Sequence, residues 1–401
     1  MMIKFNNFEF MYINLGLGGD LLSMFMIMLS YWIISLIMMM LISNLNFILF
    51  FLLLMIMVMS FMTMNFLLFY IFFELSLIPM LMIIMMNSSS IKRFKAGMYL
   101  LLYTMFFSLP LLVEIIYLNT EFMLLDMNYL MYLMIIMDNI DFLFLIMAFM
   151  VKVPIYLIHY WLLKAHVEAP VYGSMMLAGI LLKLGGYGIL RMLDFFPLSF
   201  KNYSVYIIPF LLFGALKLSW ITMFQEDMKI IIAYSSVVHM SMMVCSMFTM
   251  SDVGVFSSVM MMISHGLCSS GLFFMVNLLY EQTFSRMKFI NKGLINYSNI
   301  FSLWWFLFCS SNMAVPISLN LVSEILLFSS LINWGMMMFS LILMMIILFS
   351  SWYSLLLFLS IYGMSMNMNK INMNISMKNN LILILHWVPL NLMTLGLSLL
   401  M

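Results

Sequence analysis

Six charged residues lie inside long apolar stretches of the sequence, where a charge is costly. They are three lysines and three glutamates: Lys152, Lys183, Lys217, Glu74, Glu114 and Glu324. A charged side chain at the centre of a bilayer costs from about 3 to more than 10 kcal/mol, so such residues usually serve a function. Buried acids and bases can exchange protons, because burial disfavours the charged form of each group unless an opposite charge restores it. The pattern predicts proton transfer inside a membrane; a purely structural ion-pair network is the alternative.

Two of the lysines lie in the stretch 151–191, and their positions make this prediction more specific. Lys152 precedes Pro154 by two residues, and a proline inside a helix removes a hydrogen bond and breaks the helix. In a membrane, such a break survives only where protein or a water-filled cavity satisfies the freed backbone groups. Lys183 is eight residues before Arg191, which corresponds to about 12 Å along a helix. Either lysine could instead extend towards the lipid headgroups, but this distance argues against it for Lys183.

Two histidines extend the series of ionisable groups. His239 and His265 lie in successive apolar stretches, next to serine or glycine. An imidazole titrates near neutral pH and both accepts and donates a proton, which suits a relay. A lone histidine in a helix core is more often only hydrogen-bonded, so this prediction depends on the neighbouring lysines and glutamates. We place the other histidines on a face shared with Lys152 (His159), in a connecting loop (His166) and at the membrane interface (His386).

The composition predicts an all-α polytopic membrane protein. Of its 401 residues, 66% are hydrophobic and only 8% are charged, and the mean hydropathy is +1.16, whereas a soluble domain is about one quarter charged. Stretches of about 20 apolar residues predict about twelve spanning helices in a single transmembrane domain over residues 1–401. We place them near residues 22–42, 45–62, 65–86, 97–117, 140–160, 172–192, 203–222, 229–249, 254–280, 300–330, 337–362 and 381–400.

A weak internal repeat links two proline-containing segments. FMVKVPIYL around Pro154 resembles SNMAVPISL around Pro316, 162 residues later. Proline-interrupted segments in matching halves indicate a transporter whose site lies at its broken helices. We therefore predict two broken helices in repeat-like halves at approximately 45–192 and 203–362, followed by a C-terminal helix at 380–400.

The charges outside the predicted spans indicate an orientation. Ten basic residues, Lys229 among them, fall on one side of the predicted bundle and three, including Arg191, on the other, together with Asp194 and Asp252. Because basic residues favour the inner side of a membrane, the smaller group defines the outer side.

The three cysteines lie singly in apolar segments without a CxxC pair, so we predict no iron–sulfur, haem or zinc site on this chain.

Four segments resemble one protein family over roughly residues 20–400. They are YIFFELSLIPM at 70–80, KVPIYLIHYWLLKAHVEAPVYGSMMLAGILLKLGGYGILR at 152–191, QEDMKIIIAYSSVVHM at 225–240 and ISHGLCSSGLF at 263–273. These segments are similar to the family of NADH–ubiquinone oxidoreductase chain 4, the antiporter-like, proton-pumping subunit of mitochondrial respiratory complex I. SNMAVPISLNLVSEILLF at 311–328 is similar to the broken helix of that family.

This resemblance implies a role for each candidate residue. Glu74 and Lys152 would be the coupled pair at the start of a channel, and Lys183 the central relay. His239 and His265 would follow, and Glu324 would lie near the exit towards a neighbouring subunit. The family has fourteen helices in two inverted five-helix repeats, and its two N-terminal helices have no counterpart among the twelve predicted here. Glu114 and Lys217 are not part of the family pattern, and we treat them as a possible compensating pair.

The resemblance also implies the setting in which the chain acts. We expect a multi-pass protein of the mitochondrial inner membrane whose partners are other complex I membrane subunits, including neighbouring antiporter-like subunits, and lipids, with cardiolipin as a candidate. No nucleic acid is expected. NADH, FMN, iron–sulfur clusters and ubiquinone would be bound by other subunits, so no cofactor is expected on this chain. The alternatives are a stand-alone Mrp-type cation/proton antiporter and a structural membrane subunit without a working channel.

Overall fold

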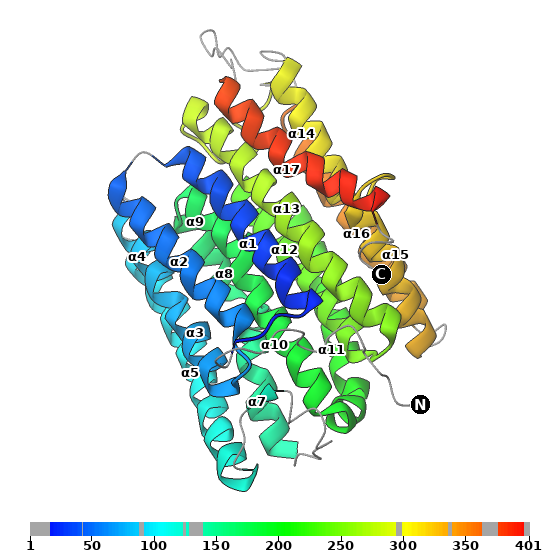
Figure 1. Cartoon of the computed structure of the whole chain (residues 1–401). Helices are drawn as coiled ribbons and strands as arrows, with labels where there is room; N and C mark the ends of the chain where they lie inside the picture. The colour runs from blue at the N-terminus through cyan, green and yellow to red at the C-terminus, as the bar shows by residue number, and fades with distance from the viewer. Residues whose placement is uncertain are drawn as a thin grey trace.

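The chain forms a bundle of long helices packed side by side (Figure 1). The computed structural model describes residues 17–41, 43–87, 92–122, 126–127, 139–293, 299–335, 339–362 and 376–396. The first half of the chain contains α1 (Leu21–Met40), α2 (Asn44–Met62), α3 (Phe66–Leu75), α4 (Leu77–Asn87), α5 (Lys92–Phe122), α7 (Asn139–Lys152), α8 (Tyr160–Glu168), α9 (Val171–Met176), the π-helix η1 (Leu177–Leu181) and α10 (Leu182–Phe195). The second half contains α11 (Pro197–Met223), α12 (Met228–Phe248), α13 (Asp252–Thr283), α14 (Asn299–Asn312), α15 (Leu319–Gly335), α16 (Ser340–Leu359) and α17 (Met377–Leu395).

Nine helical spans in the described ranges are long and apolar enough to cross a membrane. The described residues form no strand, only isolated bridges such as that between Leu17 and Thr63. The predicted all-α polytopic fold is therefore confirmed, although the number of twelve spanning helices is not established. The proposed division into halves at 45–192 and 203–362 stays a prediction.

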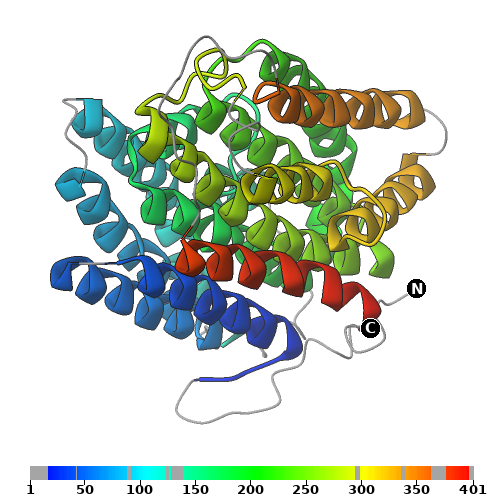
Figure 2. The same cartoon turned by 90° about the horizontal axis from the view of Figure 1, so that it is seen from above.

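Three spans form the interior of the bundle. The apolar windows of the α9–η1–α10 span and of α13 are 100% buried and that of α12 is 89% buried, whereas those of α5 and α16 are 33% buried. Helices that are apolar on all sides do not reveal their inward face by hydrophobic periodicity. Small residues can mark the inward face instead, because serine and glycine let helices approach closely. Both α12 and α13 are rich in serine. Figure 2 shows these central helices in green, with the first helices (blue) and α16 (orange) on opposite sides.

The first broken helix separates α7 from α8. The sequence predicted a spanning segment over 140–160 that is broken at Pro154, and the break is confirmed: α7 ends at Lys152 and α8 begins at Tyr160. Pro154 causes the break because it cannot continue the helical hydrogen bonds, and Leu157 has a φ of 78°, a strained value for a residue other than glycine. The indole of Trp161 donates to the carbonyl of Val151 at 3.1 Å, which satisfies one group freed at the end of α7.

The second broken helix separates α14 from α15 around Pro316, as predicted. Ala314 and Ile317 have φ values of 57° and 79°. The amide of Asn320 donates to the carbonyl of Ser311 at 2.8 Å, so a side chain from the second half-helix again satisfies a carbonyl of the first. Both predicted broken helices are therefore present, and each is bridged by one side-chain hydrogen bond.

Glycine allows α10 to lie directly against the end of α7. A Cβ atom at Gly185 would be 2.6 Å from the side chain of Val153 and 3.0 Å from the carbonyl oxygen of Phe149. Real Cβ atoms are essentially never found closer than 3.0 Å to another heavy atom. The LGGYG sequence of α10 thus brings the helix that carries Lys183 against the helix that carries Lys152.

Candidate functional site

Lys183 lies at the centre of the bundle, completely buried. It follows the π-helix η1, where the amide of Leu182 bonds to the carbonyl of Leu177, five residues earlier. Such π-turns shift the regular hydrogen-bond ladder and are frequent at functional sites. The Lys183 Nζ atom donates to the carbonyl of Ala178 at 2.5 Å and lies 3.0 Å from Nδ1 of His265. Its complete burial among the central helices favours the functional interpretation over a lysine that extends to the headgroups.

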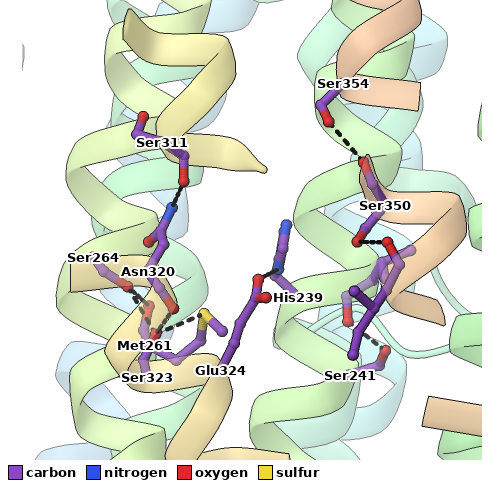
Figure 3. Close-up of polar contacts among 12 residues, drawn as sticks. His239, Ser241, Met261, Ser264, Ser311, Asn320, Ser323, Glu324, Ser350 and Ser354 are labelled. Atoms are coloured by element: carbon purple, nitrogen blue, oxygen red, sulfur yellow. Dashed lines mark hydrogen bonds and ion pairs between the residues drawn. The ribbon is translucent and has the colours of Figure 1, made fainter. Parts of the chain in front are cut away.

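A line of ionisable side chains continues from Lys183 across three further helices. His265 of α13 and His239 of α12 face each other with ring centroids 5.8 Å apart. The Nδ1 atom of His239 lies 3.5 Å from Oε1 of Glu324 on α15, and their side chains are only 7% and 13% exposed. Figure 3 shows these two side chains pointing towards each other from neighbouring helices. Four of the six predicted residues therefore lie in one buried line, with a polar contact at each end and the two imidazole rings close together in the middle.

Glu74 and Lys152 form a second group. Lys152 Nζ donates to the carbonyl of Phe73 at 2.5 Å, and it lies 3.5 Å from Oγ of Ser76, so it is held beside the residue that precedes Glu74. The Glu74 carboxylate interacts electrostatically with Lys152 and lies near the hydroxyl of Ser108, but neither of its buried oxygens makes a hydrogen bond of normal geometry to a described residue. The two side chains are neighbours but not a direct ion pair.

Helix packing alone joins the two groups. Within the described ranges, no hydrogen bond or ion pair connects Lys152 to Lys183. The helices that carry them meet at Gly185, beside Val153. A proton that moves between the two groups therefore needs water or a movement of the lysine side chains.

Glu114 and Lys217 do not form the compensating pair that we considered. Glu114 is buried on α5, and the nearby charge that acts on it is that of Asp141 on α7. Lys217 is exposed on α11, where its Nζ atom lies 4.4 Å from the ring centroid of Phe213. Lys217 is thus not an interior residue, in contrast to the other two lysines of the series.

Three histidines lie elsewhere than the sequence predicted. His386, expected at the membrane interface, is fully buried within α17. His166, which we assigned to a loop, lies in α8, is fully buried and stacks on Phe273 with ring centroids 4.7 Å apart. His159 precedes α8 after the break, so it does not share a helical face with Lys152. Apolar neighbours on both sides of His166 were the available signal for its burial.

Two cations that we assigned to the membrane surface are also buried. Lys229 lies in the first turn of α12 and donates to the carbonyl of Ala169 at 3.1 Å. Arg191 of α10 is 1% exposed and pairs with Asp20, the N-cap residue of α1, at 2.7 Å. Nothing in the sequence indicated this pair, because the partners are 171 residues apart.

The chain was compared with known protein families and with individual relatives. A family model described as "NADH:quinone oxidoreductase/Mrp antiporter, TM" matches residues 63–350. NADH-ubiquinone oxidoreductase chain 4 of Apis mellifera ligustica is 46% identical, covering 99% of this chain and 89% of that protein. The protein of the same name from Aedes aegypti is 44% identical, covering 98% of this chain and 90% of that protein.

Comparison with solved structures supports the fold independently. A chain of respiratory complex I from Thermus thermophilus with bound NADH superimposes with a TM-score of 0.85 at 21% identity, covering 94% of this chain and 81% of that one. A chain of the Mrp complex from Dietzia sp. also gives a TM-score of 0.85, at 14% identity, covering 96% of this chain and 82% of that one. The matching family model and the close relatives show that the chain belongs to the NADH:quinone oxidoreductase/Mrp antiporter family and, within it, to NADH-ubiquinone oxidoreductase chain 4.

Proposed function

We propose that this chain moves protons across the membrane as a subunit of complex I. The observation that carries the proposal is the buried line from Lys183 through His265 and His239 to Glu324. Moving one charge against a membrane potential costs about 2.3 kcal/mol per 100 mV. The chain must therefore be coupled to a reaction that releases free energy, here electron transfer from NADH to ubiquinone in other subunits.

The geometry suggests how the line works. A proton that leaves the ammonium group of Lys183 breaks an N–H bond and forms one on Nδ1 of His265, and the positive charge moves with it. From His265 it passes to His239, whose Nε2 is buried without a hydrogen-bond partner among the described residues. Glu324 then accepts the proton and becomes neutral. Glu74 and Lys152 are proposed as the first pair, which reloads Lys183.

The chain's setting follows from its family. We place it in the mitochondrial inner membrane, next to other complex I membrane subunits that include antiporter-like neighbours, and in contact with lipids such as cardiolipin. NADH, FMN, iron–sulfur clusters and ubiquinone are proposed to be bound by other subunits. The proposal assigns no electron-transfer step to this chain.

A Mrp-type cation/proton antiporter is the second candidate, because the Mrp chain has the same fold. Reconstituted complex in liposomes separates the two. We expect NADH oxidation to drive proton transport in the absence of sodium. This proton transport should stop when ubiquinone reduction is inhibited. Proton movement that requires a sodium gradient and does not depend on NADH would instead favour the antiporter.

Asn320 is expected to hold Glu324 in position. The variant Asn320→Leu removes the hydrogen bond across the second break and leaves the buried carbonyl of Ser311 with one donor fewer. We expect this to lower the stability by about 1–3 kcal/mol. Since Glu324 is one helical turn further on, we expect fewer protons pumped per NADH, measured in liposomes with a pH-sensitive dye. Ser329→Ala is the control, because Ser329 bonds only within α15. An unchanged proton yield in Asn320→Leu would show that the bond does not position Glu324.

A further inference from the structure

A second polar column leads away from Lys183 along α10. Tyr187 and Arg191 follow Lys183 at intervals of four residues, and four residues in a helix place side chains on one face about 6 Å apart. All three residues are buried to at least 99%. The column therefore runs from the centre of the bundle towards the end of α10 that we predict to face the outer side.

Direct contacts join the outer part of this column. The hydroxyl of Tyr187 donates to the carbonyl of Phe61 at 3.0 Å and accepts from Nη2 of Arg191 at 2.8 Å. The same Nη2 atom lies 2.7 Å from Oδ2 of Asp20. An arginine in a protein does not give up its proton, so Arg191 holds the phenol and the carboxylate in place and carries no proton itself.

Asp194 ends the column at a small pocket. The pocket is lined by Leu22, Leu190, Arg191, Leu193, Asp194 and Val255. Asp194 is the partly exposed acid of the cluster, whereas the Asp20 side chain is fully buried. Asp194 has no hydrogen bond to any part of the chain that the structure describes, and its charge interacts with those of Arg191 and Asp20.

The balance of charge gives the cluster a chemical capacity. Among the described residues of this cluster, one guanidinium lies beside two carboxylates, so one carboxylate is in excess in a largely buried site. A buried charge without a counter-charge is costly, and a bound proton removes that cost. The pocket beside Asp194 provides a place from which a proton can arrive or leave by water.

We infer that the outer end of α10 is a proton-exchange branch of the relay, in which Asp194 accepts the proton at the pocket and Tyr187 links it to Lys183. The N–H bond of the Lys183 ammonium breaks and an O–H bond forms on Asp194, so one positive charge moves along α10. The hydroxyl of Tyr187, which donates to Phe61 in the structure, turns and passes its proton on to Asp194, and the proton from Lys183 re-forms the O–H bond of Tyr187. The inference rests on the proposed function and extends it to a route out of the central line.

The test compares variants of the assembled complex in liposomes, with protons pumped per NADH as the readout. We expect Asp194→Asn and Tyr187→Phe each to lower this ratio as far as Lys183→Ala does, while NADH oxidation with an artificial electron acceptor is unchanged. Asp194→Glu, which keeps the carboxylate, should pump a normal number of protons per NADH. Asp252→Asn and Tyr203→Phe are the controls, because Asp252 is exposed at the start of α13 and Tyr203 stacks on Phe142 away from the relay.

The possible outcomes separate this inference from the proposed function. A normal ratio in both variants, when Lys183→Ala has lost pumping, would overturn the branch and leave the central relay intact. A normal ratio in Lys183→Ala would contradict the proposed relay itself. If Asp194→Asn prevents assembly, Tyr187→Phe decides, because removing one hydroxyl leaves the ring packed against Phe61 and Phe69.

Discussion

Lys183→Ala is expected to abolish proton pumping by this chain while the complex still assembles. Its Nζ atom is the part of α10 that contacts His265, and alanine leaves His265 without that neighbour. Electron transfer does not depend on this lysine in our proposal. The expected result is a lower number of protons pumped per NADH, with NADH oxidation by an artificial acceptor retained. Lys183→Met, which preserves most of the buried volume, should lose pumping to the same extent.

Lys217→Ala is the matched control for this experiment. Both lysines lie within apolar spanning helices, but Lys217 is exposed whereas Lys183 is fully buried. We expect Lys217→Ala to pump normally. If the two variants behaved alike, burial in the central line would not be what makes Lys183 necessary.

Arg191→Leu is expected to cause the largest loss of stability. It leaves the fully buried carboxylate of Asp20 without its cation, and removing one partner of a buried ion pair costs about 3–5 kcal/mol. Asp20 also caps α1 by accepting from the amide of Ser23 at 2.8 Å, so the start of α1 would be affected. We expect less assembled complex and a lower unfolding temperature of the purified complex.

Two further variants test the physical cause of that loss. Combining Arg191→Leu with Asp20→Asn removes the unpaired charge and keeps a good helix cap, so it should recover part of the stability. Lys201→Leu removes an exposed cation from the first half of α11 and should have little effect. A double variant as unstable as Arg191→Leu would show that lost packing, and not the unpaired carboxylate, is responsible.

The sequence was sufficient to predict the helical membrane fold and to identify four residues that the structure brings together in the buried line. Intramembrane charges are few, so Lys183 and Glu324 could be identified without knowing their neighbours. His239 and His265 were identified because they occur together with those charges. Pro316 likewise indicated the second break. Pro154 indicated the first break. Hydropathy, which averages over a window, did not give the ends of the two half-helices, and the structure places these ends at Lys152 and Tyr160.

The contacts between distant helices could not be predicted. Arg191 occurs near the end of an apolar stretch, where a surface position was the natural expectation. Only the structure shows that its partner is Asp20, the N-cap residue of α1. Lys217 was predicted to be an interior residue but is exposed. Hydropathy identifies a spanning helix but not its lipid-facing side. The spacing of Lys183, Tyr187 and Arg191 was visible in the sequence, but it gains meaning only from the contacts of Tyr187.

A map of the intact complex that resolves water molecules tests the central relay most directly. The space between Lys152 and Lys183 is the decisive region, because no direct contact joins them within the described residues. We predict ordered water that connects Glu74 and Lys152 to Lys183, and a continuous path from there through the two histidines to Glu324. A dry space filled by apolar side chains, with Lys152 and Glu324 each facing lipid, would contradict the relay.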